Sequence, residues 1–185
     1  MVENWTLGGI FGWGSGAPLN LIASTSSFTQ SNTNTPVLVG NFPKSTGQVT
    51  KLKNGITYFA GLQQVVDPGV AGVTTQQGLN SQFSNRAITD ASGTLLLVNP
   101  SPGSLGTLGQ MWIEGPRNVR LDANLDKRIR ITETKDFELR LDAINVLNHP
   151  NFDNPITLDI NDPNFGRIQS ATGNRQFVLN ARVNF

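Results

Sequence analysis

The stretch "NVRLDANLDKRIRI", residues 118–131, alternates between polar and apolar residues over nearly its whole length. Its odd positions are apolar except for Lys127, and every even position is polar or charged. A period of two predicts a β-strand with one apolar face and one hydrated face. Strands of soluble proteins usually have about 5–6 residues, so the length of this alternation already sets the stretch apart.

Three other stretches alternate in the same way, again with apolar residues at odd positions. Strands are therefore expected at 4–14, 117–131, 136–147 and 176–185. The polar turn at 132–136 is short, so the second and third strands form a hairpin. The predicted fold class is all-β, an antiparallel meander of long strands.

The remaining residues form two long loops, at 15–116 and 148–175, which are rich in Gly, Ser, Thr, Asn, Gln and Pro. Within the first loop, only residues 56–59 and 95–98 are weak strand candidates. A structureless loop of this length is unusual in a compact domain and commonly has a function. The alternation blurs at 144–146, where the third strand runs towards the second loop.

Composition excludes several classes of protein. A chain of 185 residues is expected to form one domain over 1–185, and its 15% of charged residues and 19 glycines favour strands and polar loops. Without cysteine, neither a disulfide framework nor a thiolate site is possible. A net charge of +1 gives no reason to expect a nucleic-acid partner. No apolar run reaches the roughly 18 residues of a membrane helix, and no secretory signal is visible at the start.

Alternation fits two environments, because a soluble antiparallel sheet also has one apolar and one solvated face. Three features favour a membrane barrel. The alternating stretch at 118–131 is long enough to supply the roughly 9–11 residues that a tilted strand needs to cross a bilayer. Trp5 and Trp13 lie eight positions apart on one face, about 20 Å apart along the bilayer normal, where they would act as interface aromatics. The loop 15–116 also has too few apolar residues to supply a second layer for the sheet.

In a barrel, the even positions would form a polar ladder facing a hydrated lumen. The predicted lumen-facing residues are Arg120, Asp122, Asn124, Asp126, Arg128, Glu138, Arg140, Asp142, Asn180 and Arg182. The odd positions of the last strand would face lipid, namely Phe177, Leu179, Ala181, Val183 and Phe185.

Longer motifs resemble one known family. The segment "ELRLDAINVLNHPNF", residues 138–152, is the most specific of them, and the chain also contains "SGAP" (15–18), "NPSPGSLGTLG" (99–109), "NFGRI" (164–168) and a final "RVNF" (182–185). Together they resemble the C-terminal barrel segment of TonB-dependent outer-membrane receptors of the Oar-like type found in Acidobacteria. The resemblance is strongest over residues 115–185.

The resemblance implies a 22-stranded barrel in the cell outer membrane of Gram-negative type, which takes up solutes. It also implies that the turn at 132–136 is periplasmic and that the two long loops are extracellular. The implied partners are outer-membrane lipid, the rest of the parent barrel with its plug, the TonB complex, and the barrel-assembly machinery that recognises the last strand. Since four strands cannot close a barrel and no plug or signal peptide is visible, the chain is expected to be a fragment of a longer receptor.

No residue pattern predicts chemistry, and the chain is not expected to be an enzyme or to carry a cofactor. The single histidine, His149, lies at a strand exit without partners for a triad or a metal site. "DINDPN", residues 159–164, lacks the glycine and glutamate of a calcium loop and favours a turn. "GWGSG" and "GSLGTLG" lack the lysine and helix of a phosphate loop. Glu138 and Asp142 flank Arg140, so mutual neutralisation is favoured over paired-carboxylate hydrolysis.

Two other functions remain open at this point. One is a secreted or cell-surface all-β adhesion or binding module that uses the Gly- and Asn-rich loops. The other, less favoured, is a carbohydrate-active β-sandwich, which lacks a catalytic pair. No ligand-binding residue can be identified from the sequence.

Overall fold

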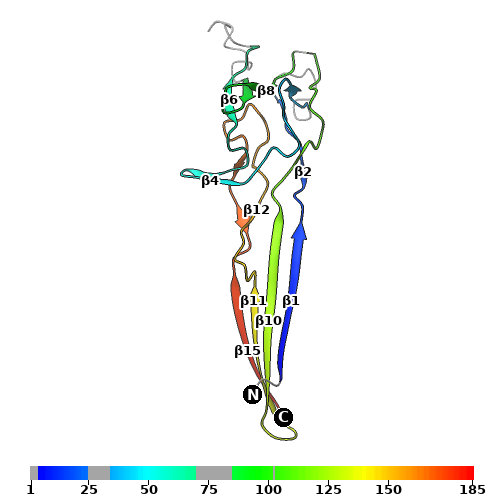
Figure 1. The fold of residues 1–185 in the computed structure, drawn as a ribbon, viewed down its shortest axis with the longest axis vertical. Helices are drawn as coiled ribbons and strands as arrows, with labels where there is room; N and C mark the ends of the chain where they lie inside the picture. Colours follow the sequence, from blue (N-terminus) through cyan, green and yellow to red (C-terminus); the bar gives the residue numbers. More distant parts are fainter. Residues whose placement is uncertain (1–3, 25–33, 70–84, 102) are drawn as a thin grey trace. The chain divides into compact units, whose positions relative to one another are not determined.

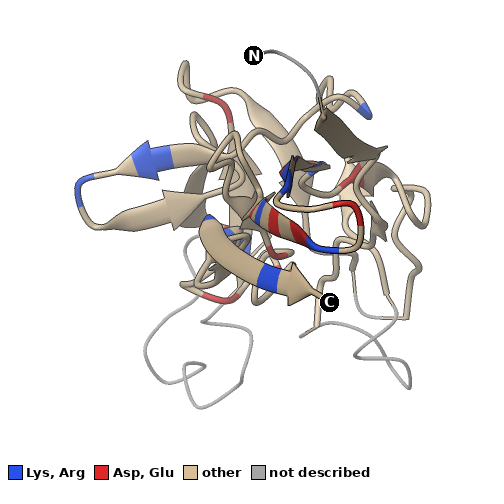
Figure 2. Ribbon diagram, turned by 90° about the horizontal axis from the view of Figure 1, so that it is seen from below, with Lys and Arg blue, Asp and Glu red and all other residues tan. Residues whose placement is uncertain are grey.

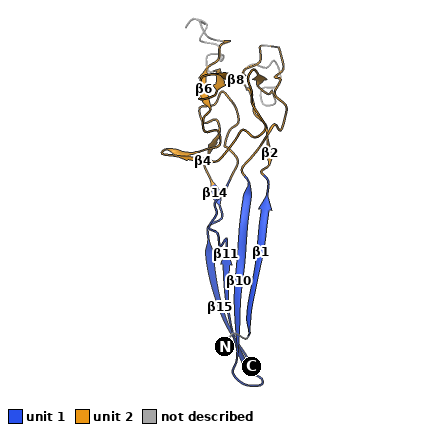
Figure 3. Ribbon diagram, viewed as in Figure 1, with its two compact units in different colours: residues 1–15, 117–152, 171–185 blue, residues 16–116, 153–170 orange. Residues whose placement is uncertain are grey.

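The computed structural model describes residues 4–24, 34–69, 85–101 and 103–185, which form strands and loops (Figure 1). Among these residues there is no helix that could cross a membrane. The chain divides into two compact units (Figure 3). Residues 1–15, 117–152 and 171–185 form the sheet unit, and residues 16–116 and 153–170 form the loop unit.

The sheet unit contains the four long strands: β1 (Trp5–Gly14), β10 (Asn118–Arg130), β11 (Asp136–Ile144) and β15 (Gln176–Asn184). They pair in the order β1-β10-β11-β15, and every pair is antiparallel. The all-β, antiparallel fold class is therefore confirmed, and each strand end lies within three residues of its expected position. A short ribbon of β12 (Asn151–Phe152) and β14 (Ala171–Thr172) completes this unit.

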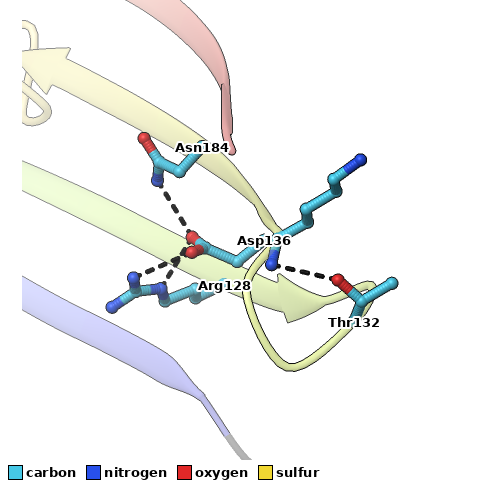
Figure 4. A network of polar contacts seen from close by, with 5 residues as sticks. Arg128, Thr132, Asp136 and Asn184 are labelled. Carbon is cyan, nitrogen blue, oxygen red and sulfur yellow. Dashed lines mark hydrogen bonds and ion pairs between the residues drawn. The ribbon is translucent and has the colours of Figure 1, made fainter.

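The turn between β10 and β11 is fixed by hydrogen bonds that satisfy its polar groups. The amides of Ile131 and Thr132 donate to the carbonyl of Lys135 at 2.9 and 3.0 Å, and the Lys135 amide donates to the Thr132 hydroxyl at 3.1 Å. Next to the turn, the Asp136 carboxylate accepts bonds from Arg128 Nε at 2.8 Å and Asn184 Nδ2 at 3.0 Å (Figure 4). One carboxylate thus links β10, β11 and β15 at the turn end of the sheet.

The structure of the long loop at 15–116 could not be told from the sequence, and the loop unit shows that this loop and the one at 148–175 contain short strands. This unit contains a four-stranded sheet of β3 (Val37–Leu38), β8 (Leu95–Val98), β7 (Arg86–Thr89) and β6 (Gln63–Val66). It also contains β13 (Arg167–Ile168) with β5 (Gly55–Thr57) and β4 (Thr50–Leu52), and β2 (Pro18–Leu19) with β9 (Ile113–Glu114). The candidate at 95–98 coincides with β8, and the candidate at 56–59 overlaps β5 at residues 56 and 57. Residues 25–33, 70–84 and 102 of the first loop lie outside the described residues.

The loop unit folds because its few apolar residues are brought together from distant positions. Leu21, Ile88, Leu97, Ile113 and Ile160 are almost completely buried. Most of them lie in short apolar runs, such as 21–23 and 95–98, that are separated by long polar stretches. Runs this short give no periodic signal, so the core was missed in the sequence.

Polar side chains complete the loop unit. The buried Asp67 carboxylate accepts 2.8 Å bonds from the backbone and side chain of Asn99. In the turn between β7 and β8, the Ser92 hydroxyl and then the Thr94 amide hold the pKa of Asp90 below its usual value, because both stabilise the carboxylate.

Candidate functional site

The registers place the odd-numbered residues of all four long strands on one face of the sheet. Side chains opposite each other in an antiparallel pair point to the same side. Leu7 lies opposite Leu125, which lies opposite Leu141, which in turn lies opposite Leu179. A row of four leucines thus crosses the whole sheet. We call the odd-numbered side the apolar face and the even-numbered side the polar face.

Most of the large side chains on the apolar face are exposed in the part of the chain that the structure describes. The exposed fraction is 78% for Leu7, 64% for Phe11 and 66% for Leu179. In the sheet of a soluble protein, side chains of this size would pack against a second layer. Burial of each one stabilises the fold by about 1.5–3 kcal/mol. Their exposure over four neighbouring strands is typical of a surface whose solvent is not water.

The predicted lipid-facing residues of the last strand lie on this face. Phe177, Ala181 and Val183 are opposite Ala143, Leu139 and Phe137 of β11. Phe185, directly after β15, is 89% exposed. Trp5 and Trp13 lie at the two ends of β1 on the same face, and both are exposed.

The polar face carries the predicted polar ladder, since all ten of its residues have even numbers and the registers pair even positions with even positions. Figure 2 shows the basic and acidic residues of the chain in blue and red. Ion pairs join Arg120 to Asp122 at 2.7 Å and Arg140 to Asp142 at 2.8 Å. Each joins neighbours two positions apart on one strand, so charges of opposite sign compensate each other locally.

The ladder continues across strands towards the turn. Arg128 bonds to Asp136 at 2.8 Å, and Asn180 Nδ2 donates to Asp142 at 3.3 Å. Asp126 lies opposite Arg140, and Glu138 lies between Arg128 and Arg182 in the register. Neither Glu138 nor Asp142 is isolated from a basic neighbour, in agreement with the neutralisation expected from the sequence.

A concave region of about 410 Å³ lies on the polar face, lined by both of the Arg–Asp pairs on β10 and β11. Ile10 and Val178 also line it, and both are exposed. These two side chains were missed, although the sequence does contain a signal: they are apolar residues at even positions of alternating strands. Together with Ile144, they place apolar side chains beside the Arg–Asp pairs in this region.

Asn145, directly after β11, is a second residue that the sequence reasoning missed. Its φ of +50° ends the strand. Its amide donates to Asp122 Oδ1 at 2.8 Å, and its buried side chain donates to the carbonyl of His149 at 3.0 Å and to that of Gly173. The blurred alternation at 144–146 was the only sign of this junction.

The remaining sequence candidates lie in turns. His149 lies after β11, where its backbone amide donates to Asn145 Oδ1 at 3.2 Å. In the segment 159–164, Asp159 and Asp162 each accept a bond from the amide two residues later, at 3.0 and 2.7 Å. These are turn-forming contacts of aspartate. In the parts of the chain that the structure describes, no group of three or more His, Cys, Asp or Glu residues could hold a metal ion.

Comparison with known families agrees with this geometry. The family described as outer membrane beta barrel domain matches residues 1–178. The chain belongs to this family. As a member, it contributes to a β-barrel of an outer membrane, and outer-membrane lipid surrounds such a barrel. No curated protein and no solved structure matches the chain.

Proposed function

We propose that the chain forms part of the wall of an outer-membrane receptor of the TonB-dependent type, of the Oar-like kind, and contributes to solute uptake without a catalytic role. One observation carries the proposal: within the described residues, every buried hydrophobic side chain belongs to the loop unit, whereas the long strands expose theirs. In a barrel wall the apolar face contacts lipid and the polar face lines the lumen.

The dimensions of the sheet support a wall segment. At about 4.8 Å per strand, four strands span roughly 20 Å, and the smallest membrane barrels have about eight strands. The outer edges of β1 and β15 are not paired within the described sheet. Because unpaired backbone groups are costly in hydrocarbon, further strands must continue the wall beyond these edges. A parent barrel with its plug, the barrel-assembly machinery and the TonB complex are the proposed partners.

The lumen and the loop unit give the wall its role in uptake. The Arg–Asp pairs keep the polar face hydrated, and the apolar side chains of Ile10 and Val178 add a surface for amphiphilic solutes. The loop unit, which has its own core, joins β1 to β10 and would stand outside the membrane as a contact surface for solutes.

The test is deletion of the coding segment in its host, followed by mass spectrometry of the solutes that remain in the medium. We expect the deletion strain to lose depletion of specific solutes, and a protonophore to have the same effect on the intact strain, because TonB-dependent uptake uses the proton gradient. Unchanged depletion, or depletion that the protonophore does not affect, would contradict the proposal. A strain that loses only surface attachment would support an adhesion module instead.

A further inference from the structure

The hairpin of β4 and β5 in the loop unit has an asparagine followed by a glycine at its turn. Asn54 is the only asparagine of the 185-residue chain that precedes a glycine. β4 ends at Leu52 and β5 begins at Gly55, and these two residues are paired. Lys53 and Asn54 therefore form a two-residue turn at the end of a hairpin, where backbones are accessible to chemical attack.

The turn is open to solvent on the side of both reacting residues. Every residue from Lys51 to Gly55 is exposed. Gly55 has a φ of +146°, and no described atom beyond its two chain neighbours lies within 4 Å of the place that a Cβ would occupy. Glycine itself has no Cβ to shield its backbone nitrogen. Neither the local sequence nor the packing of the loop unit therefore covers this backbone.

An asparagine side chain in such a place reacts with the backbone of the next residue. The backbone nitrogen attacks the side-chain amide carbon, so that an N–Cγ bond forms and the Cγ–Nδ2 bond breaks. Ammonia leaves and takes the proton of the backbone amide. Water then opens the resulting succinimide ring at either carbonyl, which gives aspartate or isoaspartate. A side chain on the next residue hinders the attack, and glycine has none.

We propose that Asn54 is a site of self-modification, at which the Gly55 backbone converts the side-chain amide into aspartate or isoaspartate and releases ammonia. Water is the only other reactant, so the reaction proceeds whether or not the sheet unit forms the wall of a receptor. The same unit supplies a contrast in Asn41, which is also exposed but is followed by the buried Phe42. The side chain of Phe42 hinders the attack there, so Asn41 should stay an amide.

The reaction changes the charge of an exposed cationic segment. Residues 43–66 contain three lysines, at 44, 51 and 53, and no aspartate or glutamate. The new carboxylate is the first negative charge in this segment, and it directly follows Lys53. The positive charge of the hairpin therefore falls as the protein ages.

Isoaspartate also lengthens the main chain by one methylene group at the turn. The turn of a two-residue hairpin sets the register of its strands, so the extra atom disturbs the pairing of Leu52 with Gly55. β4 is at the edge of the described sheet β13-β5-β4, and β5 also pairs with β13 at the buried Ile168. We therefore expect β4 to loosen while β5 and β13 stay paired.

The experiment ages the full chain in phosphatidylcholine vesicles, and the same chain in urea, at neutral and at alkaline pH. Hydrogen-exchange protection of β7 and β8 shows that the loop unit is folded in the vesicle sample. Peptide mass spectrometry locates the loss of amide, and methylation by isoaspartyl methyltransferase measures isoaspartate. We expect the product at Asn54 to form in the folded chain at a rate similar to that in urea. The rate should rise with pH, because the attacking nitrogen must lose its proton.

Two variants test the site itself. Asn54→Gln should abolish the isoaspartate signal, because glutamine must close a larger ring, and Asn41→Gln should leave it unchanged. Reaction in urea but not in the folded chain would overturn the proposal, because the folded turn would then protect Asn54. Equal loss of amide at Asn41 and Asn54 would overturn it too, since glycine would not direct the reaction.

A third variant separates the added charge from the added backbone atom. Freshly purified Asn54→Asp carries the new carboxylate on a main chain of unchanged length, so the β4 amides should keep their hydrogen-exchange protection. The aged chain should lose this protection in proportion to its isoaspartate content. An equal loss in the fresh variant would overturn the expected effect on the register, because charge alone would then loosen β4.

Discussion

The sheet unit and the loop unit treat apolar side chains in opposite ways. In the loop unit, side chains such as Leu21, Ile88 and Ile160 are buried beneath short strands and turns. In the sheet unit, Leu7, Phe177 and their neighbours stand exposed in regular rows, and none of the buried hydrophobic side chains of the described residues belongs to this unit. The same chain therefore contains one unit that buries its apolar side chains within the protein and one unit that exposes them.

The difference shows that a protein core forms where apolar side chains would otherwise contact water, and that the number of apolar residues in a unit does not decide it. The loop unit removes apolar surface from water by contacts within itself, which is the ordinary hydrophobic effect. The sheet unit leaves this surface for lipid to cover, and satisfies its backbone by pairing between strands. The contrast predicts that substitutions in the two units respond differently to the presence of a membrane.

Ile88→Ala should have the largest effect, and its effect should not depend on lipid. Ile88 is 0% exposed and lies between Gln64 of β6 and Leu97 of β8. The cavity should lower the local free energy of opening by about 2–5 kcal/mol. Hydrogen exchange of the β7 and β8 amides, measured with and without vesicles, checks this.

Val66→Ala on the exposed edge of the same sheet is the control for Ile88→Ala, with an expected change within about 0.5 kcal/mol. If Ile88→Ala reduced the hydrogen-exchange protection of β7 and β8 only in the presence of vesicles, the core of the loop unit would depend on the membrane.

Leu179→Arg should have the next largest effect, and only in a bilayer. Leu179 belongs to the row of leucines that crosses the sheet, between the levels of Trp5 and Trp13. An arginine on the lipid face costs up to about 2–4 kcal/mol, the value that applies at the middle of the bilayer. Urea titration of the vesicle-inserted chain measures this difference.

Val178→Arg is the matched control, because it places the same side chain one residue earlier on the polar face, directly opposite Asp142. We expect it to be nearly neutral. Equal destabilisation by the two variants would show that the faces are not distinguished by lipid.

Asn145→Ala should have the smallest of the three effects. It removes a buried donor from the carbonyls of His149 and Gly173, which should cost about 1–3 kcal/mol at the end of β11. Hydrogen exchange of the amides of Asn145 and His149 reports the loss.

Asn148→Ala separates this hydrogen-bond effect from the backbone effect. Asn148 is exposed and has a φ of +49°, close to that of Asn145. If the two variants lose the same protection, the left-handed backbone, and not the buried side chain, determines the stability of this junction.

Much of the sheet unit could be predicted because its information is local. Each long strand carries a period of two over nine or more residues, and a one-residue slip would reverse its faces. The same alternation also fixed which residues of each strand share a face, so the residues of the polar ladder could be named before the structure was known. The row of leucines could not, because it depends on the register between strands. The junction at Asn145 could not be placed, because its partners, His149 and Gly173, are joined only by folding.

The loop unit was missed for the opposite reason. Its strands have two to four residues, which is too short for a period to be visible. The Ile160 amide donates to the carbonyl of the distant Ile22, and the buried Asp67 is satisfied by Asn99, 32 residues away. Contacts of this kind have no signature in a window of neighbouring residues.

The sequence by itself therefore determined the number of long strands, their direction and the composition of their two faces, because side chains alternate on any extended backbone. Only the tertiary structure decided that the polar segments between them form a second unit with its own core, and that Lys127 lies opposite Trp5 on the apolar face. Those outcomes depend on which residues folding brings together across long separations, and alternation along one strand carries no information about its partner.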